Sequence, residues 1–292
     1  MKPVAFDYHR PDTVSEAVAL LSELREEAAV LAGGMTLGPM LNMRLARPRA
    51  VIDVSRMPSL RSISQTAKAI VTGAGVVQND AMHSDVIARE LPLLAMALPW
   101  VGHFQTRNRG TLGGSVAHAD PSAEIPLCLV TCGGTVVLQS RRRERRVAAR
   151  AFFLGALTTQ RQPDEIIAAL EWPRTAPDAG CAFAEIAQRH GDFALAAAAC
   201  CLRLARDGRL SELSLGLGGV ENRPIVIDVQ SFVGRTADEV AGGLAEHAAA
   251  GVTPMEDHSA SADYRIALTK VLVERVFNEA LVDAKQRGGR PQ

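Results

Sequence analysis

The stretch "LAGGMTLGP" at residues 31–39 places two adjacent glycines directly after an apolar run, and "GTLGGSVAHADP" at 110–121 repeats the pattern. Glycine has no Cβ, so its backbone N–H groups can turn toward a ligand that approaches closely. Successive N–H groups in such a turn form a partly positive nest that suits a phosphate. Two nests from separate segments would hold the two phosphates of a dinucleotide, with hydroxyl groups from Thr36, Thr111 and Ser115 nearby. Either pair taken alone is explained more simply as a hairpin turn or a helix C-cap.

The sequence around the first glycine pair predicts a small β-α-β unit that ends near residue 55. Thr13 and Glu16 have the spacing of a capping box, and the apolar positions that follow have a helical period. "AAVLAGG" (28–34) and "RAVIDVS" (49–55) then predict short buried strands. A further strand, "AIVTGAGV" at 69–76, opens a second α+β unit.

The second unit contains the second glycine pair. "DVIARELPLLAMALPWVG" (85–102) predicts mostly helix, and Asp120-Pro121 has the composition of a helix start. Strands are predicted at "GTVVLQS", "RRVAA" and "EIIAALEW". The Pro, Gly and Asp cluster at 173–180 predicts a linker.

Beyond the linker, the sequence predicts a separate α+β domain of about a hundred residues, a common domain size. Residues 181–206 and 210–227 predict long antiparallel strands, with "RHGDF" (189–193) as a hairpin turn between two of them. Residues 237–251 and 262–287 predict amphipathic helices.

Composition favours an ordinary soluble protein. Of 292 residues, 47% are hydrophobic and 22% charged, and 32 basic residues balance 32 acidic ones, so nothing global points to nucleic acid. "RRRERR" (141–146) is interrupted and lacks interleaved aromatics, so it predicts a solvated hairpin. We see no signal peptide and no apolar run of ~18 residues, and therefore predict no membrane span. Five cysteines without a CxxC pair suggest a cytoplasmic location and five buried thiols.

Motifs for most other chemistry are missing. The chain has no G-x-G-x-x-G, no P-loop, no H-E-x-x-H and no G-x-S-x-G. His118 and Asp120 supply too few ligands for a metal site, and a polar contact beside a ligand or a helix cap explains them better. The residues alone therefore predict an α+β protein with a candidate diphosphate site.

Taken together, the motifs resemble the FAD-binding medium subunit of molybdenum hydroxylases, a family that includes the carbon monoxide dehydrogenase flavoprotein and the flavin domain of xanthine dehydrogenase. The resemblance covers essentially the whole chain, from "FDYHRP" at residue 6 to "ADYRIALTKVLVERVFNEA" at 262–280. Its most specific parts are "LAGGMTLGPMLNMRLARP", "QTRNRGTLGGSVAHADPSAEIP" and "RHGDFALAAAA", in that order.

The resemblance implies the FAD-binding fold of the vanillyl-alcohol-oxidase type, not a Rossmann fold. Two α/β subdomains, at 1–56 and 57–176, would hold FAD, and an α+β domain at 177–292 would cover the flavin. The residues assigned to FAD in this way are Leu31, Ala32, Gly33, Gly34, Met35, Thr36, Leu37, Gly102, His103, Thr111, Gly113, Gly114, Ser115, His118, Glu124, Ile167, Asp192 and Phe193.

These residues divide by the part of FAD that they would meet. The backbone from Ala32 to Thr36 would wrap the diphosphate, and the residues from Thr111 to His118 would complete the diphosphate and ribityl contacts, with Glu124 bonding nearby. Gly102 and His103 would lie near the adenosine half, and Ile167 would pack on the cofactor. Asp192 and Phe193 would approach the isoalloxazine, with Phe193 as a wall against its face.

Three departures from the family pattern are visible. Met35 stands where many relatives carry Gln or His. "FAE" (183–185) lacks a lysine that some relatives place in this stretch, so we predict no cation there. No cysteine-rich insertion is present, and the additional iron–sulfur cluster of one branch of the family is therefore not expected.

By resemblance, the chain is the electron-transfer subunit of a heterotrimeric oxidoreductase. A large subunit would carry the molybdenum cofactor, a small subunit two [2Fe–2S] clusters, and FAD in this chain would pass electrons to an external acceptor; a dimer of heterotrimers is expected. No catalytic acid or base and no metal ligand is predicted in this chain. Two alternatives stay open: a free-standing FAD-dependent oxidoreductase with its own substrate pocket, and a non-catalytic partner that has lost the cofactor.

Overall fold

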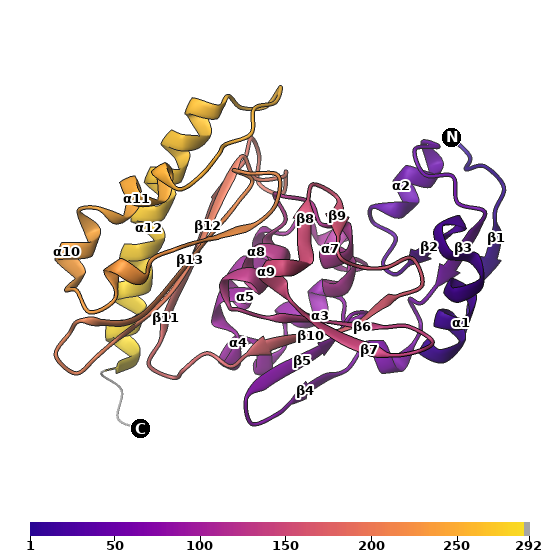
Figure 1. Cartoon of the computed structure of the whole chain (residues 1–292), viewed down its shortest axis with the longest axis horizontal. Helices are drawn as coiled ribbons and strands as arrows, with labels where there is room; N and C mark the ends of the chain where they lie inside the picture. Colours follow the sequence, from indigo (N-terminus) through magenta and orange to yellow (C-terminus); the bar gives the residue numbers. More distant parts are fainter. Residues whose placement is uncertain (289–292) are drawn as a thin grey trace.

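The computed structural model describes residues 1–288 and arranges them as three adjoining units, each built on its own β-sheet (Figure 1). The sheets use residues 7–53, 63–173 and 180–227. They follow one another across the molecule in chain order, so that the second unit touches both others (Figure 1). The result is the mixed α+β architecture that the sequence predicts. The domain limits at 56 and 176 stay a prediction.

The first unit is the predicted β-α-β arrangement with one additional strand. Strands β1 (Asp7–His9), β2 (Ala28–Leu31) and β3 (Ala50–Asp53) form a parallel sheet in the order β1-β3-β2. Helix α1 (Val14–Leu24) buries Ala17, Val18 and Leu21 beside it, and is followed by the 3-10 turn η1 (Arg25–Glu27). Helix α2 (Leu37–Asn42) follows the first glycine pair.

The predicted capping box at the start of α1 is half formed. The Thr13 hydroxyl accepts from the Glu16 N–H at 3.2 Å, as the spacing predicts. The Glu16 carboxylate accepts from the Asp12 N–H at 2.9 Å, one residue before the position that a capping box requires.

The second unit is a five-stranded antiparallel sheet covered by short helices. The order β4-β5-β10-β6-β7 joins β4 (Ile63–Gln65), β5 (Ala69–Gly73), β10 (Ile166–Pro173), β6 (Thr135–Gln139) and β7 (Glu144–Ala148). Its helices and remaining elements are η2 (Pro58–Leu60), α3 (Gln78–Met82), α4 (Asp85–Glu90), α5 (Pro92–Ala97), η3 (Leu98–Trp100), α6 (Phe104–Arg107), α7 (Leu112–His118), α8 (Glu124–Thr131), α9 (Ala149–Phe152) and the hairpin β8 (Phe153–Gly155) and β9 (Thr158–Thr159). The basic run lies in the exposed β6–β7 hairpin, as predicted.

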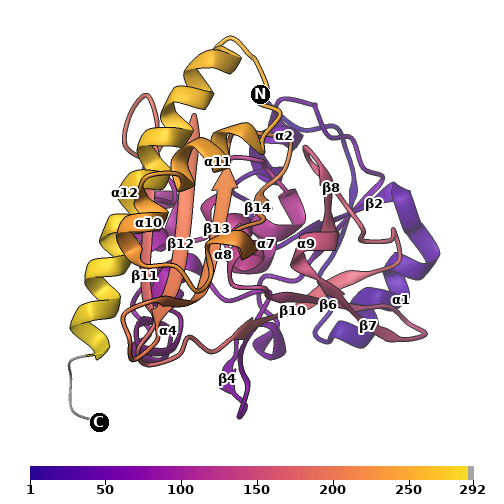
Figure 2. The same cartoon turned by 60° about the vertical axis from the view of Figure 1, so that its left-hand side comes forward.

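The third unit is an antiparallel sheet with helices on one face. Strands β11 (Gly180–Ile186), β12 (Ala196–Leu204), β13 (Leu210–Gly218) and β14 (Ile225–Ile227) pair in chain order, and α12 (Ala262–Gly288) lies along β11 and β12 (Figure 2). A side chain at Gly180 would overlap the carbonyl oxygen of Ala280, so small residues permit this close packing. The same helical layer contains η4 (Gln230–Phe232), α10 (Ala237–Ala241) and α11 (Leu244–Ala250). The opposite face of the sheet meets α5 and α8 of the second unit.

Two of the predictions about local structure are wrong, and a third is confirmed. Asp120-Pro121 does not begin a helix: α8 begins at Glu124, and the Asp120 carboxylate accepts instead from the Ser122 N–H at 2.8 Å. The "RHGDF" segment forms the predicted turn between the antiparallel strands β11 and β12: the Asp192 N–H donates to the Arg189 carbonyl at 3.1 Å, within a connection that runs from 187 to 195. Cys132 and Cys201 are only partly buried, unlike the other three cysteines. None of the helices within residues 1–288 has the length and apolar composition of a membrane span.

Candidate functional site

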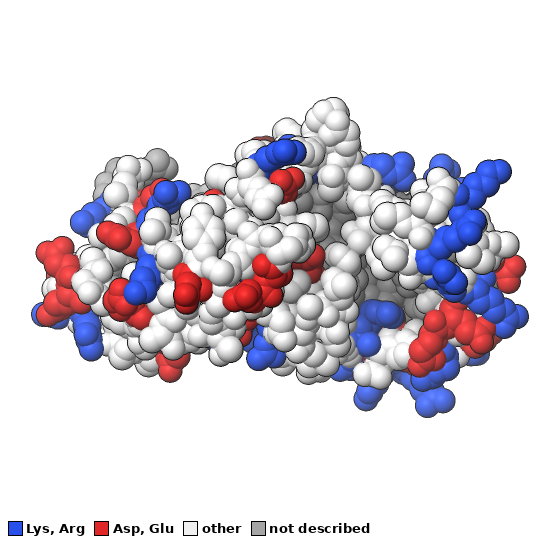
Figure 3. Space-filling model, turned by 90° about the horizontal axis from the view of Figure 1, so that it is seen from above, with Lys and Arg blue, Asp and Glu red and all other residues white. Residues whose placement is uncertain are grey.

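A cavity of about 760 Å³ lies between the first and second units and is bordered by Gly191, Asp192 and Phe193 from the third. From above, the molecule is hollowed between the N-terminal unit and the rest, where the side chains are mostly uncharged (Figure 3). Both glycine pairs line this cavity. The volume is in the range of about 300–1,000 Å³ that small-molecule and cofactor sites occupy.

The first glycine pair joins the two units and exposes a row of backbone donors. A side chain at Gly33 would overlap the backbone carbonyl of Arg109, so only glycine allows this loop to approach the second unit. Gly34 has a φ of +75°, which is the left-handed region that favours glycine. Within residues 1–288, the N–H groups of Gly33, Gly34, Met35 and Thr36 have no protein acceptor. Four consecutive free donors at a cavity wall form the anion-binding nest that the sequence suggested.

The second glycine pair is part of a helix, which corrects its interpretation as a simple turn. Thr111 caps α7: its hydroxyl accepts from the Gly114 N–H at 2.9 Å. The Gly113 N–H donates to the carbonyl of Ala74 at 2.9 Å, and a side chain at Gly113 would overlap Ala74. These N–H groups are therefore already paired, so α7 contributes shape and side chains rather than a second nest of free donors.

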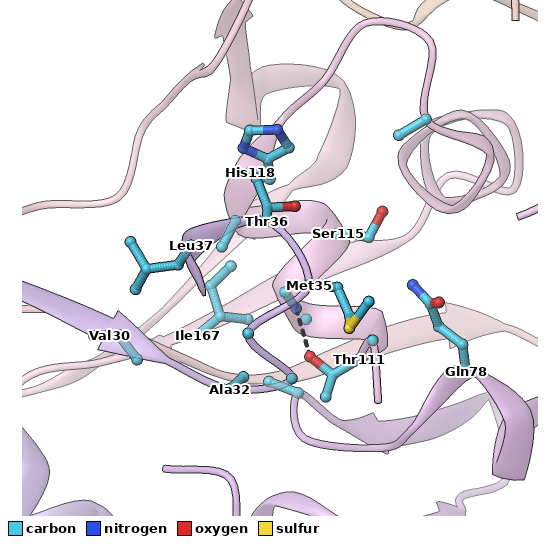
Figure 4. A pocket seen from close by; sticks show the side chains of 18 of the residues that line it. Val30, Ala32, Met35, Thr36, Leu37, Gln78, Thr111, Ser115, His118 and Ile167 are labelled. Carbon is cyan, nitrogen blue, oxygen red and sulfur yellow. Dashed lines mark hydrogen bonds between the residues drawn. The ribbon is translucent and has the colours of Figure 1, made fainter. Parts of the chain in front are cut away.

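Polar side chains from both segments face the same space. Figure 4 shows Thr36 and His118 close together, with Ser115 and Met35 nearby on the same cavity wall. In the described part of the chain, the Thr36 and Ser115 hydroxyls and the His118 ring form no hydrogen bond with other protein groups. They are available to a ligand that the nest holds.

The charged part of the wall contains more acid than base. Asp120, Glu124, Glu165 and Asp192 line the cavity, against Arg161 and His118. Burial raises the pKa of Glu165, but the hydrogen bonds from Arg145 (2.7 Å) and the Gln162 N–H (2.8 Å) outweigh it and hold that pKa below the ordinary value. Glu124 has no such partner, and burial, reinforced by the charge of Asp120, raises its pKa to about 7.

Sixteen of the eighteen residues assigned to FAD by resemblance line this one cavity; Leu31 and His103 do not. Leu31 ends β2 and packs beside Gly34, with its Cδ1 3.2 Å from the position that a Cβ would take there. His103 faces a second, shallower hollow with His190 and Phe104. The direct role of each lining residue in binding stays a prediction.

Sequence reasoning missed several polar residues of the lining, and Gln78 and Arg161 are the two whose groups lack a full set of partners. The Gln78 side chain is buried, and its Oε1 has no hydrogen-bond partner within residues 1–288. Arg161 is buried enough to lower its pKa, and its Nη1 donates to the carbonyls of Gln162 and Glu165 rather than to a carboxylate. Neither residue belongs to a recognisable motif: only the fold brings Gln78 beside Gly110, and the four-residue spacing of Arg161 and Glu165 is not the signature of any site.

Comparisons with known proteins account for nearly the whole chain. Residues 4–175 match the family described as the FAD binding domain in molybdopterin dehydrogenase, and residues 181–280 match the CO dehydrogenase flavoprotein C-terminal domain. The chain is 34% identical over 288 residues to the 6-hydroxypseudooxynicotine dehydrogenase complex subunit alpha of Paenarthrobacter nicotinovorans, covering 98% of this chain and 97% of that protein. It is also 34% identical to the carbon monoxide dehydrogenase medium chain of Hydrogenophaga pseudoflava, and the match covers 96% of this chain and 98% of that protein.

The fold is that of solved relatives as well. Carbon monoxide dehydrogenase from Hydrogenophaga pseudoflava superposes with a TM-score of 0.93 at 35% identity, covering 97% of this chain and 99% of that one. Quinoline 2-oxidoreductase from Pseudomonas putida 86 superposes with a TM-score of 0.91 at 34% identity, with the same coverage. The fold and the cavity thus define an oxidoreductase flavoprotein subunit. The chain belongs to the family of FAD-binding medium subunits of molybdenum hydroxylase-type complexes.

The cavity's own chemistry fits FAD. The four unpaired N–H groups at 33–36 suit an anionic diphosphate, and the buried Oε1 of Gln78 is an acceptor without a donor. Val54 from the first unit and Leu60 and Ile166 from the second supply apolar lining for a ring system. The same cavity therefore offers separate surfaces for the charged and the aromatic parts of a dinucleotide.

Arg161→Met is expected to weaken FAD binding about tenfold. The partly buried Arg161 guanidinium forms no salt bridge with a carboxylate within residues 1–288, and it would attract the diphosphate by about 1–2 kcal/mol at an effective dielectric constant of ~20, which is on the order of tenfold in affinity. Fluorescence titration of the FAD-free chain measures the effect. Arg174→Met is the control, because Arg174 pairs with Glu90 at 2.7 Å outside the cavity. Equal loss in both variants would contradict a role for Arg161 in the site.

Proposed function

We propose that this chain holds FAD in the cavity between its first two units and passes electrons through it from [2Fe–2S] clusters to an external acceptor. Bound FAD would supply a centre that takes up electrons singly or in pairs. The chain's own residues bind, orient and shield the cofactor: the nest at 33–36 holds the diphosphate, and Phe193 and Asp192 stand at the opening formed with the third unit. The free N–H groups of the nest are the observation that carries this proposal.

We further propose that the clusters and the molybdenum cofactor belong to two partner subunits, one small and one large, assembled as a dimer of heterotrimers. Relatives of this chain bear names such as medium chain and complex subunit alpha, which supports a multi-subunit assembly. Within residues 1–288, no group of three or more His, Cys, Asp and Glu residues is suitably placed for a metal ion. The reacting metal centres are therefore assigned to other chains.

The test is purification of the complex through a tag on this chain from its native host. Two further subunits, molybdenum, iron and FAD are expected to accompany it, and an organic substrate of the complex should bleach the visible flavin absorption only when all three subunits are present. Turnover of an organic substrate by this chain alone would contradict the proposal and support a free-standing oxidoreductase.

A further inference from the structure

Glu185 is a buried carboxyl group on the strand that faces the second unit. Side chains alternate along β11, and Cys181 and Phe183 belong to the core shared with α8, while Ala182 and Ala184 pack in the core beneath α12. Glu185 follows the period of the first set and so points toward α8 and the cavity wall. Only 5% of the residue is exposed.

No protein group neutralises this carboxyl group. Its Oε2 has no hydrogen-bond partner, and Glu185 forms no salt bridge within residues 1–288. An unpaired buried carboxylate is strongly disfavoured, and such a group normally takes up a proton instead. Burial raises the pKa of Glu185 to about 8, and the nearby charge of Glu124 adds to the effect.

The groups around Glu185 are acids and thiols. Glu124 and Cys128 lie on α8, Asp120 precedes that helix, and Cys181 shares the strand. On the neighbouring strand β12, Ala197 lies opposite Glu185, and Cys201 is on the same face. Arg203 follows the same period further along β12 and is paired with Asp178 and Glu212. Helix α5, "PLLAMA", presents only apolar side chains. Every ionisation here adds negative charge beside a cavity whose wall already carries more acid than base.

We propose that Glu185 is a neutral carboxylic acid at physiological pH and that its proton limits the negative charge behind Glu124, which lines the cavity that FAD would occupy. This inference rests on the proposed binding of FAD. Loss of the proton would place a second negative charge behind Glu124, in a region of low dielectric constant where repulsion of the anionic diphosphate is weakly screened. Glu185 is thus a positioning residue: FAD binding and retention of its proton favour each other.

The first test is the pH dependence of FAD affinity in the full chain. For the wild type, the dissociation constant should rise as the pH passes about 8 and then level off, by up to about tenfold in total, because the repulsion between the Glu185 carboxylate and FAD limits the effect. Glu185→Gln keeps the shape of the neutral acid and should lose the part of this rise that Glu185 causes, while the titration of Glu124 near about pH 7 remains. The control is Glu90→Gln, because Glu90 is equally buried but paired with Arg89 and Arg174 outside the cavity, and this variant should retain the wild-type profile.

A second measurement needs no variant. Calorimetric titration of the wild type with FAD in two buffers of different ionisation enthalpy should reveal net proton uptake near about pH 8. No uptake, or a parallel alkaline loss of affinity in wild type and Glu185→Gln, would overturn the inference. Failure of the wild type to bind FAD at any pH would instead contradict the proposed function.

Stability gives a readout without FAD. The pKa of Glu185 is about 8 in the folded chain and about 4.5 in the unfolded chain. Its protonated carboxyl group therefore contributes its full share to the free energy of unfolding below about pH 4.5, and this share is lost as the pH rises toward about 8. Between about pH 4.5 and 8, the unfolding midpoint of Glu185→Gln should therefore increase relative to that of the wild type as the pH rises. A constant difference across it would show that Glu185 holds no additional proton in the folded chain.

Discussion

Replacing Gly33 by alanine is expected to release FAD and to lower the free energy of unfolding by about 3 kcal/mol, the upper part of the range for overpacked sites. The new methyl group would overlap the backbone carbonyl of Arg109, which cannot rotate away as a side chain can. The 33–36 loop would have to move, and its N–H donors would move with it. Loss of two bonds to a charged group costs about 3–6 kcal/mol, which corresponds to at least a hundredfold in affinity.

Gly38→Ala is the matched control for this change. Gly38 is five residues further on, in α2, and a side chain there meets nothing within 4 Å. Because alanine is favoured over glycine in a helix by roughly 0.5–1 kcal/mol, this variant should be slightly more stable and bind FAD normally. FAD titration and denaturant unfolding measure both quantities. Normal FAD affinity in Gly33→Ala would contradict the role assigned to this loop.

Arg265→Met is expected to destabilise the third unit by about 4 kcal/mol, the cost of breaking a buried charged contact. Arg265 lies on α12 with 1% of its surface exposed and donates to the backbone carbonyls of Leu195 and Gly219. It also pairs with Asp257 at 2.7 Å. Because these carbonyls belong to the backbone, a substitution removes only the arginine. The methionine side chain cannot donate to the carbonyls, which would then stay in the core without a hydrogen-bond donor.

The effect should reach the cavity, because Leu195 closely follows Phe193 in the segment that borders it. Lys270→Met on the same helix is the control: its pairing with Glu246 is largely exposed and contributes well under about 1 kcal/mol. Urea unfolding compares the two variants. A loss below about 1 kcal/mol for Arg265→Met would show that other groups or water satisfy these carbonyls.

The backbone conformation of the first glycine pair was predicted correctly from the sequence and that of the second was not, for a physical reason. Gly33 and Gly34 follow a strand, where a glycine turn is the expected continuation. Gly113 and Gly114 lie inside the first turn of α7, a position that helix propensity disfavours, so local rules favour a turn. The contact between Gly113 and Ala74 overrides propensity there, and it joins segments almost forty residues apart.

Tertiary contacts also override local sequence preferences elsewhere in the site. Asp120-Pro121 has the composition of a helix start, but the Pro121 carbonyl accepts from the Gly219 N–H of the third unit, and this tertiary bond fixes a different path. Gln78, Arg161 and Glu185 become notable only through burial without a full set of partners. Most of the residues that the family pattern assigned to FAD line the cavity, but the pattern gave no indication that this chain buries a lone acid beside them.

The most direct test of this account is the FAD content of the purified full-length chain after reconstitution and gel filtration, read from its visible spectrum and from the FAD released on denaturation. We expect one FAD per chain in the wild type and in Gly38→Ala, and little or none in Gly33→Ala. A folded wild-type chain that stays colourless and takes up no FAD would contradict the central claim that the cavity between the first two units is a flavin site.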